Sequence, residues 1–368
     1  MDYNYFVQTI SNKYNYDEEL SIAIRLTLPL MVEKYGNDKM QDICNLFENT
    51  KIFTSSDMSL QTRRRIEEEM TRGVNENVTF VTENLYKNNN DPGSYYSSVP
   101  VFDENSNVID EKKWVVVKDM KNASNGSKYK ELFGTSINMP YFIHEINHAF
   151  AMQNPLYRKN GDILESKHGM FREQMKIETE SGKIKVSTID AKNIIIEEGI
   201  NEKYTQDMLT RLLEKQDYSE VTEDLRAINH NGTSYSPTLI NFSEKLIELL
   251  GDDKIYQYRN QNNMQILKEF NEKASKSEIA QAYCEGDKPF DYFDKKCFGI
   301  FTLASNGYKL PIEVFTTRVK ELTVEGFTPL CAYQDIEKGT MSKDKFDKIK
   351  ASVLGIELEK STSKSVTK

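Results

Sequence analysis

This chain of 368 residues contains little cysteine and no long apolar run. Its 4 cysteines are dispersed without CxxC spacing, so reduced thiols are expected rather than a disulfide framework. No stretch of 18 apolar residues is present, so no transmembrane helix and no membrane partner are predicted. Residues 1–6 lack the basic region and the apolar core of a secretory signal. We expect a cytoplasmic protein, or a secreted one whose signal was removed or is non-standard.

Positive charge is also in deficit. Lys and Arg number 48 against 57 Asp and Glu, which gives a net charge of −9. This balance disfavours non-specific binding to nucleic acid or to anionic membranes. The basic run Arg63-Arg64-Arg65 is followed at once by Glu67-Glu68-Glu69, a pattern typical of a solvated helix face. No nucleic-acid partner is therefore expected, and the oligomeric state is left open.

Histidine is scarce as well, with 4 residues in the chain, yet two of them stand four positions apart in His144-Glu145-Ile146-Asn147-His148. Residues at i and i+4 share one face of a helix, so both rings can bind one zinc ion. The glutamate between them can act as general base on the water that the metal activates. The frequencies of His and acidic residues give a chance match of roughly 0.7%.

The flanks of this motif favour a buried helix. Phe142, Ile143, Ala149 and Phe150 are apolar, and Pro140 stands near the start, where a missing backbone N–H costs little. The alternative is an ordinary buried helix with two hydrogen-bonded histidines. Three protein ligands and a water are usual for catalytic zinc, so a third ligand is required. The zincins with a third His six residues after the second are excluded, because Asn154 stands there.

A second acidic segment, residues 193–205, is predicted to begin a buried helix. It runs Asn-Ile-Ile-Ile-Glu-Glu-Gly-Ile-Asn-Glu-Lys-Tyr-Thr, and it places Glu198 and Glu202 on one helix face. With the first motif, this segment resembles the gluzincin metallopeptidases, the broad thermolysin-like group. Their signature is HExxH followed by a helix with a ligand Glu and an acid four positions later. The resemblance covers the two motifs, and 49 residues separate His148 from Glu198.

The resemblance implies one Zn²⁺ ion per chain, bound by His144, His148 and Glu198. It implies that Glu202 orients His144 through the other ring nitrogen. Glu197 is the competing ligand candidate. Such enzymes also place a Tyr or His near the developing oxyanion. Candidates for that catalytic role are His230, Tyr235, Tyr157 and His168.

The expected fold class is α+β: a zincin-like catalytic unit with a β-rich lobe, the HExxH helix and a mostly helical C-terminal part, preceded by an N-terminal helical segment. The expected domain bounds are residues 1–73, 74–205, 206–358 and a disordered tail over 359–368. Several elements are predicted within these bounds. They are a helix or strand over 18–35, a helix capped by Asp57 and ended near Gly73, strands at 78–82 and 114–117, a hairpin within 169–190, and helices at 239–250, 311–322 and 342–354.

By the resemblance, an edge strand of the β-rich lobe holds a peptide substrate by β-augmentation, with residues 114–117 and 135–138 as candidates. The leading hypothesis is a zinc-dependent peptidase that uses Glu145 as general base. Endopeptidase action is favoured, because no acidic N-terminus-binding motif precedes His144. The alternatives are an inactive peptidase-like binding or regulatory module, and a toxin or effector protease with one protein target.

Overall fold

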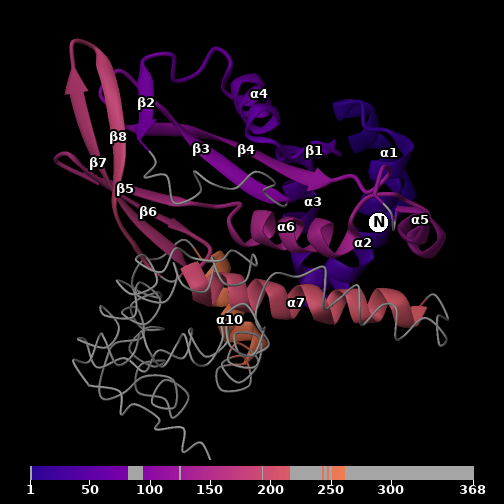
Figure 1. The fold of residues 1–368 in the computed structure, drawn as a ribbon. Coiled ribbons are helices and arrows are strands. Elements are labelled where there is room, and N and C mark those ends of the chain that lie inside the picture. The colour runs from indigo at the N-terminus through magenta and orange to yellow at the C-terminus, as the bar shows by residue number, and fades with distance from the viewer. Residues whose placement is uncertain are drawn as a thin grey trace, which may run out of the picture. The chain divides into compact units, whose positions relative to one another are not determined.

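The computed structural model describes residues 2–81, 94–123, 126–192, 194–215, 243, 247 and 251–261. All of these residues belong to one compact unit, which mixes helices and strands as the expected α+β class requires (Figure 1). The helices are α1 (Tyr3–Tyr14), α2 (Glu18–Tyr35), the 3₁₀ turn η1 (Asn37–Lys39), α3 (Met40–Asn49), α4 (Leu60–Thr71), α5 (Gly126–Phe133), α6 (Met139–Ala151), α7 (Ile194–Lys215) and α10 (Asp252–Asn260). The strands are β1 (Lys51–Ser55), β2 (Val78–Val81), β3 (Tyr95–Phe102), β4 (Val108–Lys118), β5 (Leu156–Asn160), β6 (Ile163–His168), β7 (Phe171–Glu180) and β8 (Lys183–Lys192).

The ambiguous segment 18–35 is a helix, α2, which contains Pro29. Ile24, Leu28 and Met31 are fully buried, and their spacing of three to four residues places them on one helix face. The side chain of Asp17 caps the helix by accepting the backbone N–H of Leu20 at 2.8 Å. The buried face of α2 belongs to the same apolar core as α6.

The cap of α4 differs from the prediction. Ser59 is the N-cap residue, and its hydroxyl accepts the backbone N–H of Thr62 at 3.3 Å. Asp57 stands two residues earlier and accepts hydrogen bonds from Ser59 and from the Thr62 hydroxyl. Asp57 therefore holds the capping loop rather than capping the helix. The helix ends at Thr71, two residues before Gly73, which has a positive φ of 76°.

A three-stranded sheet in the order β1-β4-β3 separates α4 from α6 (Figure 1). Trp114 and Val116 face the α4 side, whereas Val115 and Val117 belong to the core that contains α6. Residues 114–117 thus lie in the central strand, so the expectation that they form an edge is wrong. Residues 135–138 form a single bridge, Asp119 to Ile137, rather than a strand. The outer strand next to β4 is β3, which pairs with it antiparallel.

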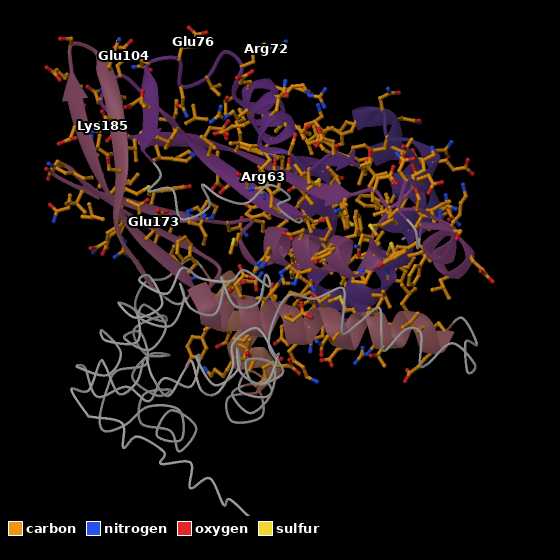
Figure 2. The ribbon with its side chains drawn as sticks, in the orientation of Figure 1. Arg63, Arg72, Glu76, Glu104, Glu173 and Lys185 are labelled. Carbon is orange, nitrogen blue, oxygen red and sulfur yellow. The ribbon has the colours of Figure 1, made fainter. Side chains whose placement is uncertain are left out.

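The second sheet has five strands in the order β2-β8-β7-β6-β5. The predicted hairpin is present as β7 and β8, joined at Ser181 and Gly182, both with positive φ. A small apolar cluster covers one face of this sheet. Figure 2 shows charged side chains on the hairpin, with Glu173 on β7 and Lys185 on β8. No helix among the described residues is long and apolar enough to cross a membrane.

Helix α6 lies between β4 and α7, and α10 contacts it as well (Figure 1). This arrangement packs two segments that are distant from the HExxH motif in sequence, 194–215 and 251–261, against the helix that carries it. The predicted helices at 311–322 and 342–354 and the tail at 359–368 lie outside the described residues, as does the helix at 239–250 apart from residues 243 and 247.

Candidate metal centre

Helix α6 carries the HExxH motif and is buried along almost its whole length. Asn138 caps its start by accepting the backbone N–H of Tyr141, and a proline occupies the first turn. Phe142, Ile146 and Phe150 are at most 1% exposed, which explains why this helix forms within the core. His144 and His148 emerge from the same face, with their ring centroids 4.7 Å apart.

Three predicted ligands meet at one point. The Nε2 atoms of His144 and His148 lie 3.1 Å apart, and Glu198 Oε2 lies 3.1 Å from His148 Nε2 and 3.4 Å from His144 Nε2. Glu198 comes from the first turns of α7, which packs against α6. Each residue offers one donor atom, so this group could hold a metal ion.

Glu202 stands one helical turn after Glu198 and bonds to the outer nitrogen of His144. Its Oε2 lies 3.0 Å from His144 Nδ1, and the pair is buried. The other oxygen, Oε1, accepts a hydrogen bond from Gln206 at 3.1 Å. An acceptor at Nδ1 favours the tautomer that leaves Nε2 free to bind a metal. The structure thus places Glu202 where the resemblance implied.

Glu197, the competing ligand candidate, points elsewhere. Its carboxylate accepts three hydrogen bonds from Arg259, one from Nη2 to Oε1 at 2.5 Å and one from Nε to each oxygen at 3.2 Å. It also accepts the backbone N–H of Met170 at 3.0 Å. The Nδ1 of His148 lies 3.6 Å from Glu197 Oε1. Glu197 therefore lies on the Nδ1 side of the His148 ring, whereas Glu198 lies on the Nε2 side and joins the donor group.

Glu145 is buried beside the two histidines. Burial raises the pKa of its carboxyl, and the positive charge of His144 and His148 opposes that rise. The backbone N–H of Tyr96, on the outer strand β3, is a lesser influence that also lowers this pKa. The motif glutamate thus belongs to a helix that contacts the outer strand of the three-stranded sheet.

The electrostatics of the group favour positive charge. Burial alone lowers the pKa of His144, but hydrogen bonds to Glu198 and Glu202 outweigh it and raise this pKa well above its usual value. For His148, burial is outweighed by the charge of Glu198 and by the nearby carboxylates of Glu197 and Glu198, and its pKa rises to about 9. Burial raises the pKa of Glu198, yet the two histidines bring it well below the usual value. A cation placed between these side chains is therefore favoured.

Two candidates for the oxyanion role, Tyr157 and His168, lie together at a different carboxylate. The Tyr157 hydroxyl donates to Glu111 Oε1 at 2.9 Å, and His168 Nδ1 lies 3.6 Å from the same oxygen. Neither residue belongs to the His144-His148-Glu198 group. The other two candidates, His230 and Tyr235, lie outside the described residues.

Two site residues were not singled out from the sequence, Asn201 and Arg259. Asn201 Nδ2 donates to the backbone carbonyl of His144 at 2.8 Å, and its Oδ1 accepts from Arg259 Nη2 at 2.9 Å. Asn201 shares a helix face with Glu198, so its place in the acidic motif was the available signal. Arg259 lies 61 residues after Glu198, and nothing in its local sequence distinguishes it.

Comparisons with protein-family models, with curated proteins and with solved structures found no match for this chain. The functional argument therefore depends on the geometry of the site.

Proposed function

We propose that this chain is a zinc-dependent peptidase of the gluzincin type, with His144, His148 and Glu198 as metal ligands. The observation that carries the proposal is the spacing of the three donor atoms. Atoms bound at 2.0–2.1 Å to a tetrahedral zinc lie roughly 3.3–3.4 Å apart. The observed separations of 3.1, 3.1 and 3.4 Å are close to that geometry, so a small adjustment of the side chains would accommodate the ion.

The donor chemistry supports zinc in particular. Two imidazole nitrogens and one carboxylate are the ligand set of thermolysin-type catalytic zinc, which keeps a fourth position open. When bound, zinc supplies a Lewis acid that polarises a carbonyl and lowers the pKa of water. Glu202 fixes the ring of His144 through the 3.0 Å contact at Nδ1.

Glu145 is proposed as the general base. It takes a proton from the attacking water and passes it to the leaving amine of the substrate. Its raised pKa, caused first by burial, brings the carboxyl nearer to neutral pH, where it can both accept and release a proton.

The substrate is proposed to be an extended peptide that pairs with β3. This strand is the outer one next to β4, and it contacts α6, the helix that carries Glu145. Main-chain pairing along such an edge binds a peptide with little regard to sequence. It would place the scissile bond near the general base. Cleavage within chains is favoured, since no acidic N-terminus-binding motif precedes His144.

The test combines metal content with cleavage of a labelled unfolded protein. We expect about one zinc per parent chain, loss of zinc in His148→Ala, and retained zinc with cleavage reduced about 100- to 10,000-fold in Glu145→Gln. The third result separates metal binding from proton transfer, because glutamine keeps the shape and loses the base. Full activity of Glu145→Gln, or absence of zinc from the parent after reconstitution, would contradict the proposal.

A further inference from the structure

We propose that Glu197 and Arg259 form a positioning pair for His148, which orients this ligand as Glu202 orients His144. The inference rests on the proposed function, because it assigns a role at the same metal site. In this proposal Arg259, which is far from the HExxH motif in sequence, helps to position both histidines.

The first observation is the outer nitrogen of His148. When Nε2 binds a metal, the ring proton resides on Nδ1, which then needs an acceptor. His148 Nδ1 is buried and has no hydrogen-bond partner at standard distance within the described structure. Glu197 Oε1 lies 3.6 Å from it. A small movement of the ring on metal binding closes that gap.

The second observation is how tightly Glu197 is held. Both its oxygens accept from Arg259, and Oε2 also accepts the Met170 N–H at 3.0 Å. Glu197 and Arg259 are each 1% exposed. A two-point arginine–carboxylate contact fixes the direction of the carboxylate as well as its position. Glu197 therefore presents its oxygen to His148 from a fixed place.

Arg259 reaches His144 by a second route. Its Nη2 donates to Asn201 Oδ1 at 2.9 Å, and Asn201 Nδ2 donates to the carbonyl of His144 at 2.8 Å. Asn201 is 0% exposed. One guanidinium thus connects to the ring side of His148 and to the backbone of His144. A purely structural ion pair would not require these two separate connections.

The helix that supplies Arg259 is itself anchored on the site. Ile255 and Tyr258 of α10 are buried, and Asn260 Nδ2 donates to the carbonyl of Phe150 on α6 at 3.2 Å. Lys167 Nζ donates to the carbonyl of Arg259 at 3.3 Å. These contacts hold the guanidinium against α6 and α7, so its hydrogen bonds are made by an ordered group.

A buried ion pair can also be only structural, and an apolar replacement of both partners then leaves stability nearly unchanged. The double variant Glu197→Leu/Arg259→Met separates the two roles, because it removes both charges together. We expect it to fold with a lower urea midpoint, because the Met170 N–H and Asn201 Oδ1 lose their partners, while its zinc affinity falls about 10- to 100-fold, the range for loss of an outer-sphere partner. The visible absorption of the Co²⁺ complex should change as well.

The matched control is Lys254→Ala, which removes an exposed hydrogen bond within the same helix, from Lys254 Nζ to Gln257 Oε1 at 3.0 Å. Its zinc affinity should stay within about twofold of the parent. If the double variant does not fold, Arg259→Lys replaces it. Lysine keeps the charge but loses the two-point contact, and affinity should fall severalfold.

Unchanged zinc affinity and an unchanged Co²⁺ spectrum in a folded variant, with zinc bound by the parent, overturn this inference alone. Absence of zinc from the parent overturns the proposed function, and the inference with it.

Discussion

The α6–α7 cluster (His144, His148 and Glu198) and the β4–β6 cluster (Glu111, Tyr157 and His168) contain similar side chains in buried surroundings. The pKa values of their histidines are shifted in opposite directions. The pKa of His148 is raised to about 9, whereas burial lowers that of His168 to about 4. Burial acts the same way on both, so another factor must separate them.

That factor is what each carboxylate already binds. Glu198 lies 3.1 Å from His148 Nε2 and shares its charge between two rings. Glu111 accepts the Tyr157 hydroxyl at 2.9 Å and pairs with Lys113 at 2.9 Å, while His168 is 3.6 Å away. A carboxylate neutralised by lysine offers little to a neighbouring ring. In this protein, a buried histidine therefore favours positive charge where the neighbouring carboxylate is not already paired with a lysine.

The largest expected effect comes from removing the carboxylate that distinguishes the α6–α7 cluster. Glu198→Ala should lower zinc affinity by more than about 100-fold, because a ligand is lost rather than an outer partner. Competition with a chromophoric chelator measures this directly.

Glu202→Ala should lower zinc affinity by about 10- to 100-fold, because it removes the acceptor at His144 Nδ1. The same chelator competition measures this loss.

Gln206→Ala is the control for this series. Gln206 bonds to Glu202, one step further from the donors, and its loss should leave zinc affinity within about twofold of the parent. Equal losses for Glu198→Ala and Gln206→Ala would mean that the three donors do not bind the metal.

The β4–β6 cluster predicts an acid-sensitive contribution to folding. His168 has a folded pKa of about 4 against the usual 6.5, so the unfolded chain takes up this proton first as pH falls. The free energy of unfolding should therefore decrease between pH 6.5 and pH 4, by up to about 3 kcal/mol from this group. Urea unfolding of the parent and of His168→Gln across this window measures the difference, and the variant should show the smaller decrease.

Lys113→Met sharpens the same comparison. It removes the charge that neutralises Glu111, so Glu111 should raise the pKa of His168 toward its usual value. The histidine C2 proton signal then titrates at higher pH. A His168 pKa that is the same in both proteins would show that Lys113 does not control the effect of Glu111 on this histidine.

The sequence predicted the motif-bearing parts of this molecule well. HExxH spacing placed both histidines on one face of α6, and the Glu198–Glu202 spacing placed a ligand candidate and its neighbour on α7. The hairpin was readable too, because its alternation and its Ser181-Gly182 turn are local signals. Each of these features depends on contacts within a few residues of the chain.

Two of the missed features depend on distant contacts, and the third depends on local loop geometry. Residues 114–117 were a candidate edge, but β4 is central because β1, which is far away in the chain, pairs along its other side, with Lys51 opposite Trp114. Arg259 is unremarkable in its own helix and acquires its role from Glu197, 62 residues earlier. The cap of α4 shifted from Asp57 to Ser59 because both are good capping residues and the loop geometry chooses between them.

Gly169 connects the two clusters and supplies the smallest predicted effect. It follows His168 in the turn after β6 and has a φ of 61°. A Cβ there would lie 2.9 Å from Glu197 Oε2, which Arg259 and the Met170 N–H prevent from moving freely. Gly161 has a φ of 62° and nothing within 4 Å of such a Cβ, so it is a matched control for backbone strain.

Gly161→Ala should cost about 1 kcal/mol in the free energy of unfolding, from the left-handed backbone alone. Gly169→Ala should cost about 2 kcal/mol, because the displaced Glu197 adds to the same strain. It should also weaken zinc binding severalfold, which Gly161→Ala should not do. Urea unfolding and chelator competition on both variants give the two differences. Equal stability and equal affinity in the pair would mean that Glu197 yields its position at no cost, and the two clusters would then be mechanically independent.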